Sequence, residues 1–269
     1  MIYFIPTPIG NLDDISLRSL KLLSECQILF CEDTRVTKKL LNLLSQRHSL
    51  EFHIEKYISL HSHNEKKVLE SLDKAIFEKN VAYLSDAGMP CVSDPGAYFV
   101  KYAQENALDY EVLPGANAAL LAYASSGFSS ARFSFYGFLP HKGKERVNAL
   151  NEVLSSKYPV ILYESPHRIE KLSQELAQLS PLLNACFIKE ATKKFEAKIF
   201  GTCKEIYEKI LVSNLKGEWV VVLDTNDDGS KGIISKEDIL SLSLPPKQKA
   251  KLLAKLTGES VKEWYEKLS

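Results

Sequence analysis

The chain has 269 residues, and 34 Lys and Arg residues balance 34 Asp and Glu residues, so the formal net charge at pH 7 is zero. A hydrophobic content of 45% and a charged content of 25% are typical of a globular protein with a sizeable core. No apolar run approaches the roughly 18 residues that a membrane span needs, and residues 1–6 lack the basic start of a signal peptide. We therefore expect neither a membrane protein nor a secreted one.

The cysteines and the charge balance narrow the class of protein further. No two of the five cysteines form a C-x-x-C pair, so we expect neither a disulfide scaffold nor a structural zinc site. His61, His63 and Glu65 lie close in sequence, but this spacing is a weak signal, and we expect no metal. A neutral chain does not bind nucleic acid through bulk positive charge, although a local basic patch still allows RNA binding.

Short apolar runs and helical periodicities alternate through the first half of the chain. The runs predict strands at residues 2–5, 27–31, 81–84 and 110–113. Apolar residues at helical spacing predict a helix over 12–23 and another that begins after 32–35 and continues to residue 44. This alternation is typical of an α/β domain with a largely parallel sheet.

The second half repeats the pattern and ends in a basic tail. Helices are predicted at 116–125, 147–154, 169–179 and 204–211, and strands at 133–137, 159–164, 185–189 and 219–224. The polar residues 226–230 have the composition of a linker. Residues 231–269 are expected to form two or three short helices, and they carry eight Lys against five Asp and Glu, a net charge of +3.

Polar segments, some of them with glycine or proline, follow most of the predicted strands. They occupy residues 7–11, 32–35, 85–96, 163–168 and 189–196. Ligands of open α/β sheets bind at the carboxyl ends of strands, so several such segments in one chain predict a ligand crevice there. Segment 7–11 lacks the glycine patterns of a P-loop or a Rossmann motif. The two acidic turns within 85–96 are the hardest to explain as turns alone.

Three of these segments also have a simpler interpretation. Glu32 and Asp33 are favoured at a helix start by the helix dipole alone. No G-x-S-x-G turn accompanies Ser165, so we interpret His167 and Arg168 as phosphate or RNA contacts, or as the start of a helix. The charged residues of 189–196 form either a solvated loop or, together with 141–146, a basic rim.

Taken together, eight motifs resemble, in order and spacing, those of the bacterial 16S ribosomal RNA (cytidine-2′-O)-methyltransferases. That family belongs to the tetrapyrrole methylase-like, class III methyltransferases. The motifs are TPIGNLDDISLRSL (7–20), CEDTRVTKKLL (31–41), SDAGMPCVSDPG (85–96), LPGANAAL (113–120), FYGFLP (135–140), YESPHR (163–168), KEATKKFE (189–196) and GEWVVVLD (217–224). Residues 244–268 also resemble the family's small helical C-terminal domain, whereas Met89, Cys91 and Ala116–Asn117 depart from its usual pattern.

The resemblance implies two α/β domains, residues 1–114 and 115–228, with a ligand cleft between them, and a small helical domain at 231–269. It also implies that S-adenosyl-L-methionine donates a methyl group to the 2′-oxygen of a cytidine in the decoding region of 16S ribosomal RNA. The expected partners are 16S rRNA or the small ribosomal subunit and a second copy of the chain, in the cytoplasm and without a membrane. The residues implied to bind the donor are Pro8, Asp86, Ala87, Gly88, Met89, Asn117, Ala118, Tyr163, Glu190 and Ala191.

Catalytic and RNA-binding roles can also be assigned on this basis. We expect the loop of Glu32, Asp33 and Arg35 to face the ribose hydroxyl, opposed by Lys193 or Glu190. The expected RNA contacts are Arg35, Lys142, Lys144, Arg146, His167, Arg168, Lys247 and Lys249. Two alternatives stay open: a methyltransferase for a tetrapyrrole or another small molecule, and a non-catalytic ribosome-binding module. The Lys-rich tail favours RNA, because an enzyme for small molecules does not need it.

Overall fold

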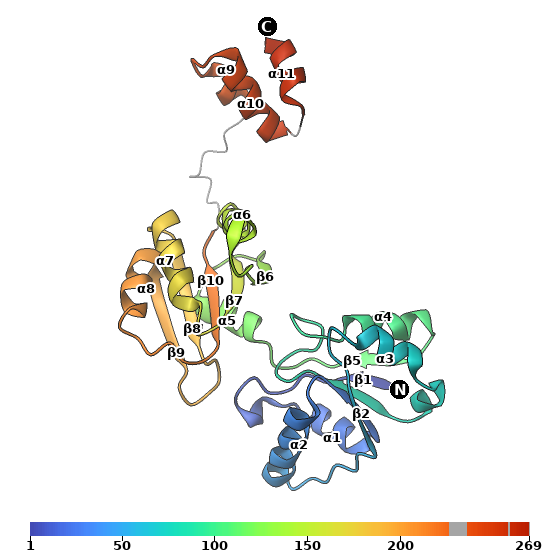
Figure 1. Cartoon of the computed structure of the whole chain (residues 1–269). Coiled ribbons are helices and arrows are strands. Elements are labelled where there is room, and N and C mark those ends of the chain that lie inside the picture. Colours follow the sequence, from blue (N-terminus) through green and yellow to red (C-terminus); the bar gives the residue numbers. More distant parts are fainter. Residues whose placement is uncertain (226–235, 258, 269) are drawn as a thin grey trace. The chain divides into compact units, whose positions relative to one another are not determined.

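The computed structural model describes residues 1–225, 236–257 and 259–268. The chain divides into two compact units, Met1–Asn226 and Asp227–Ser269 (Figure 1). The first unit contains two five-stranded sheets, each covered by helices, and the second contains three helices. The α/β class predicted from the sequence is therefore confirmed, as is the helical C-terminal region.

The first sheet is entirely parallel, in the order β3-β2-β4-β1-β5. Its strands are β1 (Ile2–Phe4), β2 (Ile28–Cys31), β3 (Lys56–Ser59), β4 (Val81–Leu84) and β5 (Tyr110–Val112). Its helices are α1 (Leu17–Glu25), α2 (Thr34–His48), α3 (Glu65–Ser71) and α4 (Ala97–Glu105), with 3₁₀ turns at Leu12–Asp14 and Lys74–Glu78. Every residue of β2 and β4 is buried, which explains why these strands are continuous apolar runs in the sequence.

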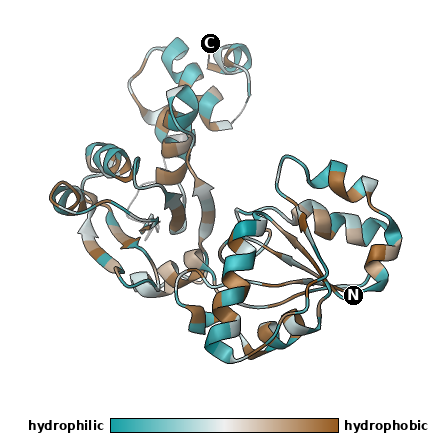
Figure 2. Ribbon diagram, turned by 60° about the horizontal axis from the view of Figure 1, so that its bottom comes forward, coloured by the Kyte–Doolittle hydropathy of each residue, from teal (hydrophilic) through white to brown (hydrophobic). Residues whose placement is uncertain are grey.

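Alternating side chains of these strands build two cores, one on each face of the first sheet. Phe4 and Phe30 pack with residues of α3 and α4, including Phe99, whereas Ile5 and Leu29 pack with residues of α1 and α2. This follows from the two-residue period of a strand. In Figure 2 the apolar colouring gathers on the strands and on the helix faces turned toward them.

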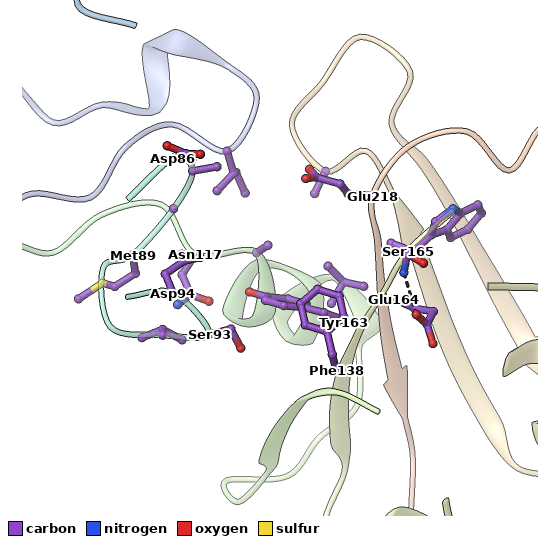
Figure 3. A pocket seen from close by; sticks show the side chains of 18 of the residues that line it. Asp86, Met89, Ser93, Asp94, Asn117, Phe138, Tyr163, Glu164, Ser165 and Glu218 are labelled. Atoms are coloured by element: carbon purple, nitrogen blue, oxygen red, sulfur yellow. Dashed lines mark hydrogen bonds between the residues drawn. The ribbon is translucent and has the colours of Figure 1, made fainter. Parts of the chain in front are cut away.

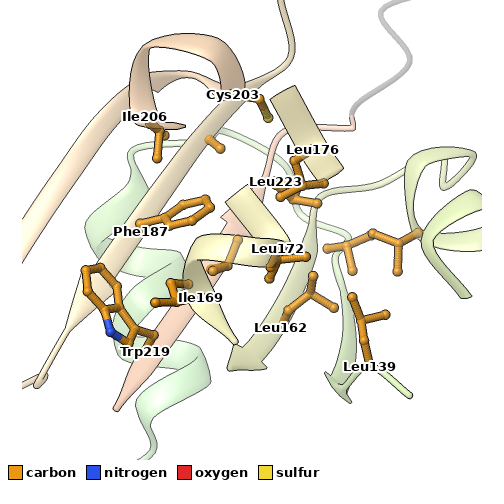
Figure 4. Close-up of a cluster of buried hydrophobic side chains, with 14 of the residues drawn as sticks. Leu139, Leu162, Ile169, Leu172, Leu176, Phe187, Cys203, Ile206, Trp219 and Leu223 are labelled. Carbon is orange, nitrogen blue, oxygen red and sulfur yellow. The ribbon is translucent and has the colours of Figure 1, made fainter. Parts of the chain in front are cut away.

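The second sheet has the order β6-β7-β10-β8-β9, and only β6 and β7 run parallel. The strands are β6 (Ser134–Phe138), β7 (Val160–Glu164), β8 (Asn184–Lys189), β9 (Ala197–Thr202) and β10 (Trp219–Leu223). Helices α6 (Gly143–Leu154), α7 (Ile169–Leu179) and α8 (Cys203–Ile210) pack on one face, in the core of Figure 4. Helix α5 (Ala118–Ser126) packs on the other face through Ala119 and Ala122.

Four elements were absent from the sequence-based prediction. Strands β3 and β9 have mostly exposed or half-buried residues, so neither is a continuous apolar run. Helices α3 and α4 follow polar, turn-rich segments, which conceal where a helix begins. The parallel sheet predicted for the first half is confirmed, whereas the second sheet is mainly antiparallel.

The described residues of the second unit form α9 (Lys236–Ser241), α10 (Pro246–Thr257) and α11 (Val261–Leu268). Ile239, Ala250, Leu253 and Trp264 form its small core, and the Trp264 indole N–H donates to the Thr257 hydroxyl at 2.8 Å. The predicted linker at 226–230 lies outside the described residues. The predicted boundary between residues 114 and 115 stays a prediction.

Candidate functional site

The first unit contains a pocket of about 490 Å³ (Figure 3). From the first sheet, Glu32 after β2 and the segment after β4, including Asp86–Met89 and Asp94, line the pocket. From the second sheet, it is lined by Phe138, Tyr163–Pro166, Ala191 and Glu218–Val220. Asn117 and Ala118, where the chain passes from one sheet to the next, complete it. The loops at the carboxyl ends of the parallel strands thus meet at one site, as the sequence predicted.

A pair of backbone hydrogen bonds holds the loops after β1 and β4 together. The Thr7 N–H donates to the Gly88 carbonyl at 2.9 Å, and the Gly88 N–H donates to the Thr7 carbonyl at 3.1 Å. The Thr7 hydroxyl also donates to the Ser85 carbonyl at 3.3 Å. These contacts place the turn of Asp86–Met89 beside Pro8 and fix that side of the pocket.

Negative charge dominates the pocket. Glu32, Asp86, Asp94, Glu164 and Glu218 line it, and no lysine or arginine is among its described lining residues. Burial, followed by the charges of Glu32, Asp86 and Glu218, raises the pKa of Asp94 to about 7. Burial also raises the pKa of Glu32 and of Asp86. Such a pocket favours a cationic ligand and disfavours a phosphate.

The loop predicted to face the hydroxyl is divided in the structure. Glu32 lines the pocket, whereas Asp33 caps helix α2 by accepting a hydrogen bond from the Arg35 N–H at 2.8 Å. The Arg35 guanidinium pairs with Asp33 at 2.6 Å, and its side chain is 89% exposed. Hydrogen bonds from the Arg35 side chain and backbone lower the pKa of Asp33 to about 2. Of this loop, only Glu32 reaches into the pocket.

A lysine bridge joins the loop after β8 to the start of β10. The Lys193 ammonium donates to Glu190 at 2.9 Å and to Glu218 at 2.7 Å. Burial alone would lower the pKa of Lys193, but these two carboxylates outweigh it and raise the pKa, so Lys193 stays charged. Burial alone would raise the pKa of Glu190, but Lys193 and the Glu218 N–H lower it.

The same loop contacts the loop after β1. The Asn11 N–H donates to the Thr192 hydroxyl at 3.1 Å. A Cβ at Gly10 would lie 2.4 Å from Cγ of Lys193 and 3.0 Å from the Ala191 carbonyl, so this close approach requires glycine. Segments 7–11 and 189–196, each singled out in the sequence, are therefore in direct contact at the site.

Most residues predicted to bind the donor line the pocket. They are Asp86, Ala87, Gly88, Met89, Asn117, Ala118, Tyr163 and Ala191. Pro8 and Glu190 are adjacent in sequence to the lining residues Ile9 and Ala191. The prediction omitted Ser93, Asp94, Phe138, Glu164 and Glu218, although the turn at 93–96 already pointed to Asp94.

The basic residues predicted to contact RNA occupy different environments. Lys142, Lys144, His167 and Lys247 are exposed, and the Lys249 ammonium donates to the Leu240 carbonyl at 2.6 Å. Arg146 is buried, and its guanidinium donates to Glu175 at 2.7–3.0 Å and to the Pro140 carbonyl at 3.0 Å. Arg168 is half-buried and donates to Glu164 at 3.1 Å and to the Leu139 carbonyl at 2.7 Å.

These two arginines hold the pocket wall at the ends of β6 and β7. Glu164 is fully buried, accepts the Ser165 N–H at 2.9 Å and lies 3.9 Å from the Arg146 guanidinium. The carbonyls of Leu139 and Pro140, just beyond the lining residue Phe138, accept from the same two guanidinium groups. The guanidinium groups of Arg146 and Arg168 therefore stabilise the wall of the pocket from inside the protein.

In the described part of the chain, no group of three or more His, Cys, Asp or Glu side chains is arranged to hold a metal ion. Likewise, no helix within 1–225, 236–257 or 259–268 is long and apolar enough to cross a membrane.

Comparison with known proteins shows that this chain is similar to methyltransferases. Residues 1–207 match the family model of the Tetrapyrrole (Corrin/Porphyrin) Methylases. The chain is 51% identical over 269 residues to a protein of Campylobacter fetus named ribosomal RNA small subunit methyltransferase I, covering 100% of this chain and 99% of that protein. It is 43% identical to the protein of the same name from Helicobacter pylori strain J99, covering 98% and 96%.

A solved structure shares the fold at low sequence identity. It is the uroporphyrin-III C-methyltransferase of Thermus thermophilus in complex with S-adenosylhomocysteine, with a TM-score of 0.55 and 15% identity. The similarity covers 83% of this chain and 97% of that structure.

Proposed function

The chain belongs to the ribosomal RNA small subunit methyltransferase I family of the tetrapyrrole methylases, and we propose that it methylates the 2′-oxygen of a cytidine in the decoding region of 16S rRNA with S-adenosyl-L-methionine as donor. A relative with that family name is 51% identical over the whole chain, which supports 16S rRNA as the acceptor. The pocket with five carboxylates and no lining lysine or arginine among its described residues carries the assignment of the donor.

The charge and shape of the pocket fit this donor. S-adenosyl-L-methionine supplies a methyl group on a positively charged sulfur and also carries an amino group, and both cationic centres are favoured beside Glu32, Asp86, Asp94 and Glu218. Tyr163 and the turn of Asp86–Met89, with Asn117, Ala118 and Ala191, would hold the donor, and Pro8 and Glu190 would support them from adjacent positions. A solved structure of the same fold contains the demethylated product of this donor, which supports the same choice.

On the acceptor side, the chain must align a ribose hydroxyl and assist the loss of its proton. Alignment in a fixed site contributes several kcal/mol to such reactions, up to roughly 7–11 in ideal cases. We assign the hydroxyl-facing position to Glu32, with the bridge of Lys193 and Glu190 opposite. Arg35, exposed at the start of α2 and paired with Asp33, is placed to bind a phosphate of the RNA.

RNA binding is assigned to exposed basic side chains. The target cytidine must leave its stack for its 2′-hydroxyl to enter a pocket, so recognition is local and depends on RNA shape. Lys142, Lys144 and His167 in the first unit and Lys247 in the tail unit form the proposed contacts. Lys249, half-buried and bound to the Leu240 carbonyl, is proposed to contribute its charge beside Lys247. Arg146 and Arg168 are left out of this set because their guanidinium groups are bound to Glu175 and Glu164. The family resemblance also supports a homodimer that acts on the small ribosomal subunit in the cytoplasm.

Transfer of labelled methyl groups tests the acceptor. Wild-type protein and labelled S-adenosyl-L-methionine are incubated with one acceptor at a time. The acceptors are small subunits from a strain that lacks the modification, naked 16S rRNA and a tetrapyrrole. Label in a cytidine ribose of the subunit or the rRNA is the expected result. Label only in the tetrapyrrole would support the proposed donor and contradict the proposed acceptor. Failure to bind the donor in a calorimetric titration would favour the non-catalytic alternative.

A further inference from the structure

The five carboxylates of the pocket differ in their hydrogen bonds. The Asp86 N–H donates to Glu32, and the Asp33 N–H donates to Asp86 at 3.1 Å. Glu164 accepts from Ser165 and Arg168, and Glu218 accepts from Lys193. Among the residues that the structure describes, none donates a hydrogen bond to the side chain of Asp94. Asp94 is therefore the pocket carboxylate whose oxygens stay available to a ligand.

The position of Asp94 is not explained by a structural role in its own turn. The N-cap of helix α4 is Gly96, two residues after Asp94, and the helix has no side-chain cap. The Gly96 N–H donates to the buried Glu65, so Asp94 takes no part in the start of this helix. The preceding residue, Ser93, has a left-handed backbone with φ of 60°, which is uncommon outside glycine. In Figure 3 Asp94 lies on the side of the pocket formed by Asp86, Met89 and Asn117.

Three other carboxylates of the pocket act on Asp94 through their charges. Glu32 faces it from the end of β2, Asp86 from the loop after β4 and Glu218 from the start of β10. The other titratable neighbours are Tyr83, Cys91 and Tyr163, whose pKa values burial raises and the Asp94 charge raises further. Burial and the three carboxylates raise the pKa of Asp94 to about 7, near the pH at which a general base works best.

The other carboxylates named for the reaction are weaker candidates for receiving a proton. Hydrogen bonds with Arg35 lower the pKa of Asp33 to about 2. Lys193 and the Glu218 N–H lower the pKa of Glu190 in spite of its burial. Glu32 already accepts the Asp86 N–H, which leaves it suited to orient the hydroxyl.

We propose that Asp94 is the catalytic base that accepts the proton of the ribose 2′-hydroxyl. This inference rests on the proposed function. The new bond joins the 2′-oxygen to the methyl carbon while the bond between that carbon and sulfur breaks and its electron pair stays on sulfur. The 2′-O–H bond breaks in the same step, and the proton moves to a carboxylate oxygen of Asp94, so the charges and atoms balance.

The first test compares rates across pH for wild-type, Asp94→Asn, Glu32→Gln and Asp73→Asn proteins. General-base assistance is typically worth about 10²–10⁴-fold, so kcat for D94N on small subunits is expected to fall by about 100-fold or more. Wild-type kcat should rise with pH to a plateau with its inflection at or below pH 7. E32Q should move that inflection to lower pH, because the charge of Glu32 raises the pKa of Asp94, and D94N should lose the inflection. Asp73, exposed and outside the pocket, caps the 3₁₀ turn at Lys74–Glu78, and D73N should behave as wild type.

The second test measures protons rather than activity. A carboxyl with a pKa of about 7 is partly protonated at pH 7, so a cationic donor that drives it to the ionised form should release a fraction of a proton per molecule bound. Calorimetric titration of S-adenosyl-L-methionine in two buffers of different ionisation enthalpy gives this number. Wild type and D73N should release the proton, and D94N should not.

These tests separate the inference from the function on which it rests. A D94N protein with kcat within about threefold of wild type, or with an unchanged inflection or proton release, would overturn the role of Asp94 alone. If wild-type protein labels no ribosomal acceptor, the proposed function fails and the inference fails with it. Thermal unfolding of D94N at pH 5 should occur at no lower temperature than that of wild type, which separates loss of the base from loss of the fold.

Discussion

Replacement of Arg146 by methionine should destabilise the first unit rather than weaken RNA binding. The Arg146 side chain is 2% exposed, and its guanidinium makes three hydrogen bonds to the two oxygens of Glu175. Removing one partner of a buried ion pair costs about 3–5 kcal/mol, because the other charge remains without compensation. In the variant, Glu175 is still 23% exposed and lies 3.9 Å from Lys171, and Glu164 is still paired with Arg168. Because both carboxylates retain this compensation, we expect a loss at the lower end of that range, about 3 kcal/mol.

Urea unfolding followed by the fluorescence of the buried Trp219 measures this change. The double variant R146M/E175Q should lose less stability than the sum of the two single variants, because the stranded charge is removed together with its partner. Lys144→Met is the matched control, since Lys144 is exposed on the same helix: it should cost less than about 0.5 kcal/mol and weaken RNA binding. The reasoning fails if R146M loses less than about 1 kcal/mol while its RNA affinity falls like that of K144M.

Four further changes have definite expected outcomes. Gly217→Ala places a Cβ 2.4 Å from Cγ of Glu190 at a φ of 118°, so it should cost about 1–3 kcal/mol in urea unfolding and weaken donor binding in calorimetry; unchanged values of both would contradict the described packing. Deletion of residues 231–269 should weaken RNA binding far more than donor binding, and equal loss of both would make the tail structural. Arg35→Ala should lower RNA affinity and turnover, and unaltered turnover would remove this residue from the mechanism. Because the pKa of Asp94 is raised, its stabilising contribution is present below about pH 4 and is lost as the pH rises through 7. With the charge of the partly exposed carboxylate screened by solvent, D94N should be more stable than wild type at pH 8 by about 1–2 kcal/mol. An equal difference in stability at pH 5 and pH 8 would contradict this.

The sequence was most informative where burial is complete. Strands β2 and β4 are buried on both faces, and such strands are continuous apolar runs that periodicity detects. Half of the residues of strand β9 are exposed and none is buried, so no apolar run marks it. The antiparallel course of β10 was likewise hidden, because strand direction is set by neighbours and not by the strand's own residues.

The site could be predicted in part for the same reason. The loops after β2, β4 and β7 follow recognisable strands, and this placed Glu32, Asp86 and Tyr163 at the pocket. Glu218 precedes β10 and reaches the pocket only because β10 runs antiparallel to its neighbours, which no local signal revealed. The burial of Arg146 depends on Glu175 of another helix, a contact that sequence reasoning could not supply.

The proposed reaction modifies one atom, the 2′-oxygen of a cytidine in 16S rRNA. It is tested most directly by incubating unmodified small subunits with the protein and S-adenosyl-L-methionine, digesting the rRNA and identifying the methylated nucleoside by mass spectrometry. We predict 2′-O-methylcytidine in a fragment from the decoding region, absent when the protein is omitted. A methyl group on a base, on another nucleoside or outside that region would contradict it.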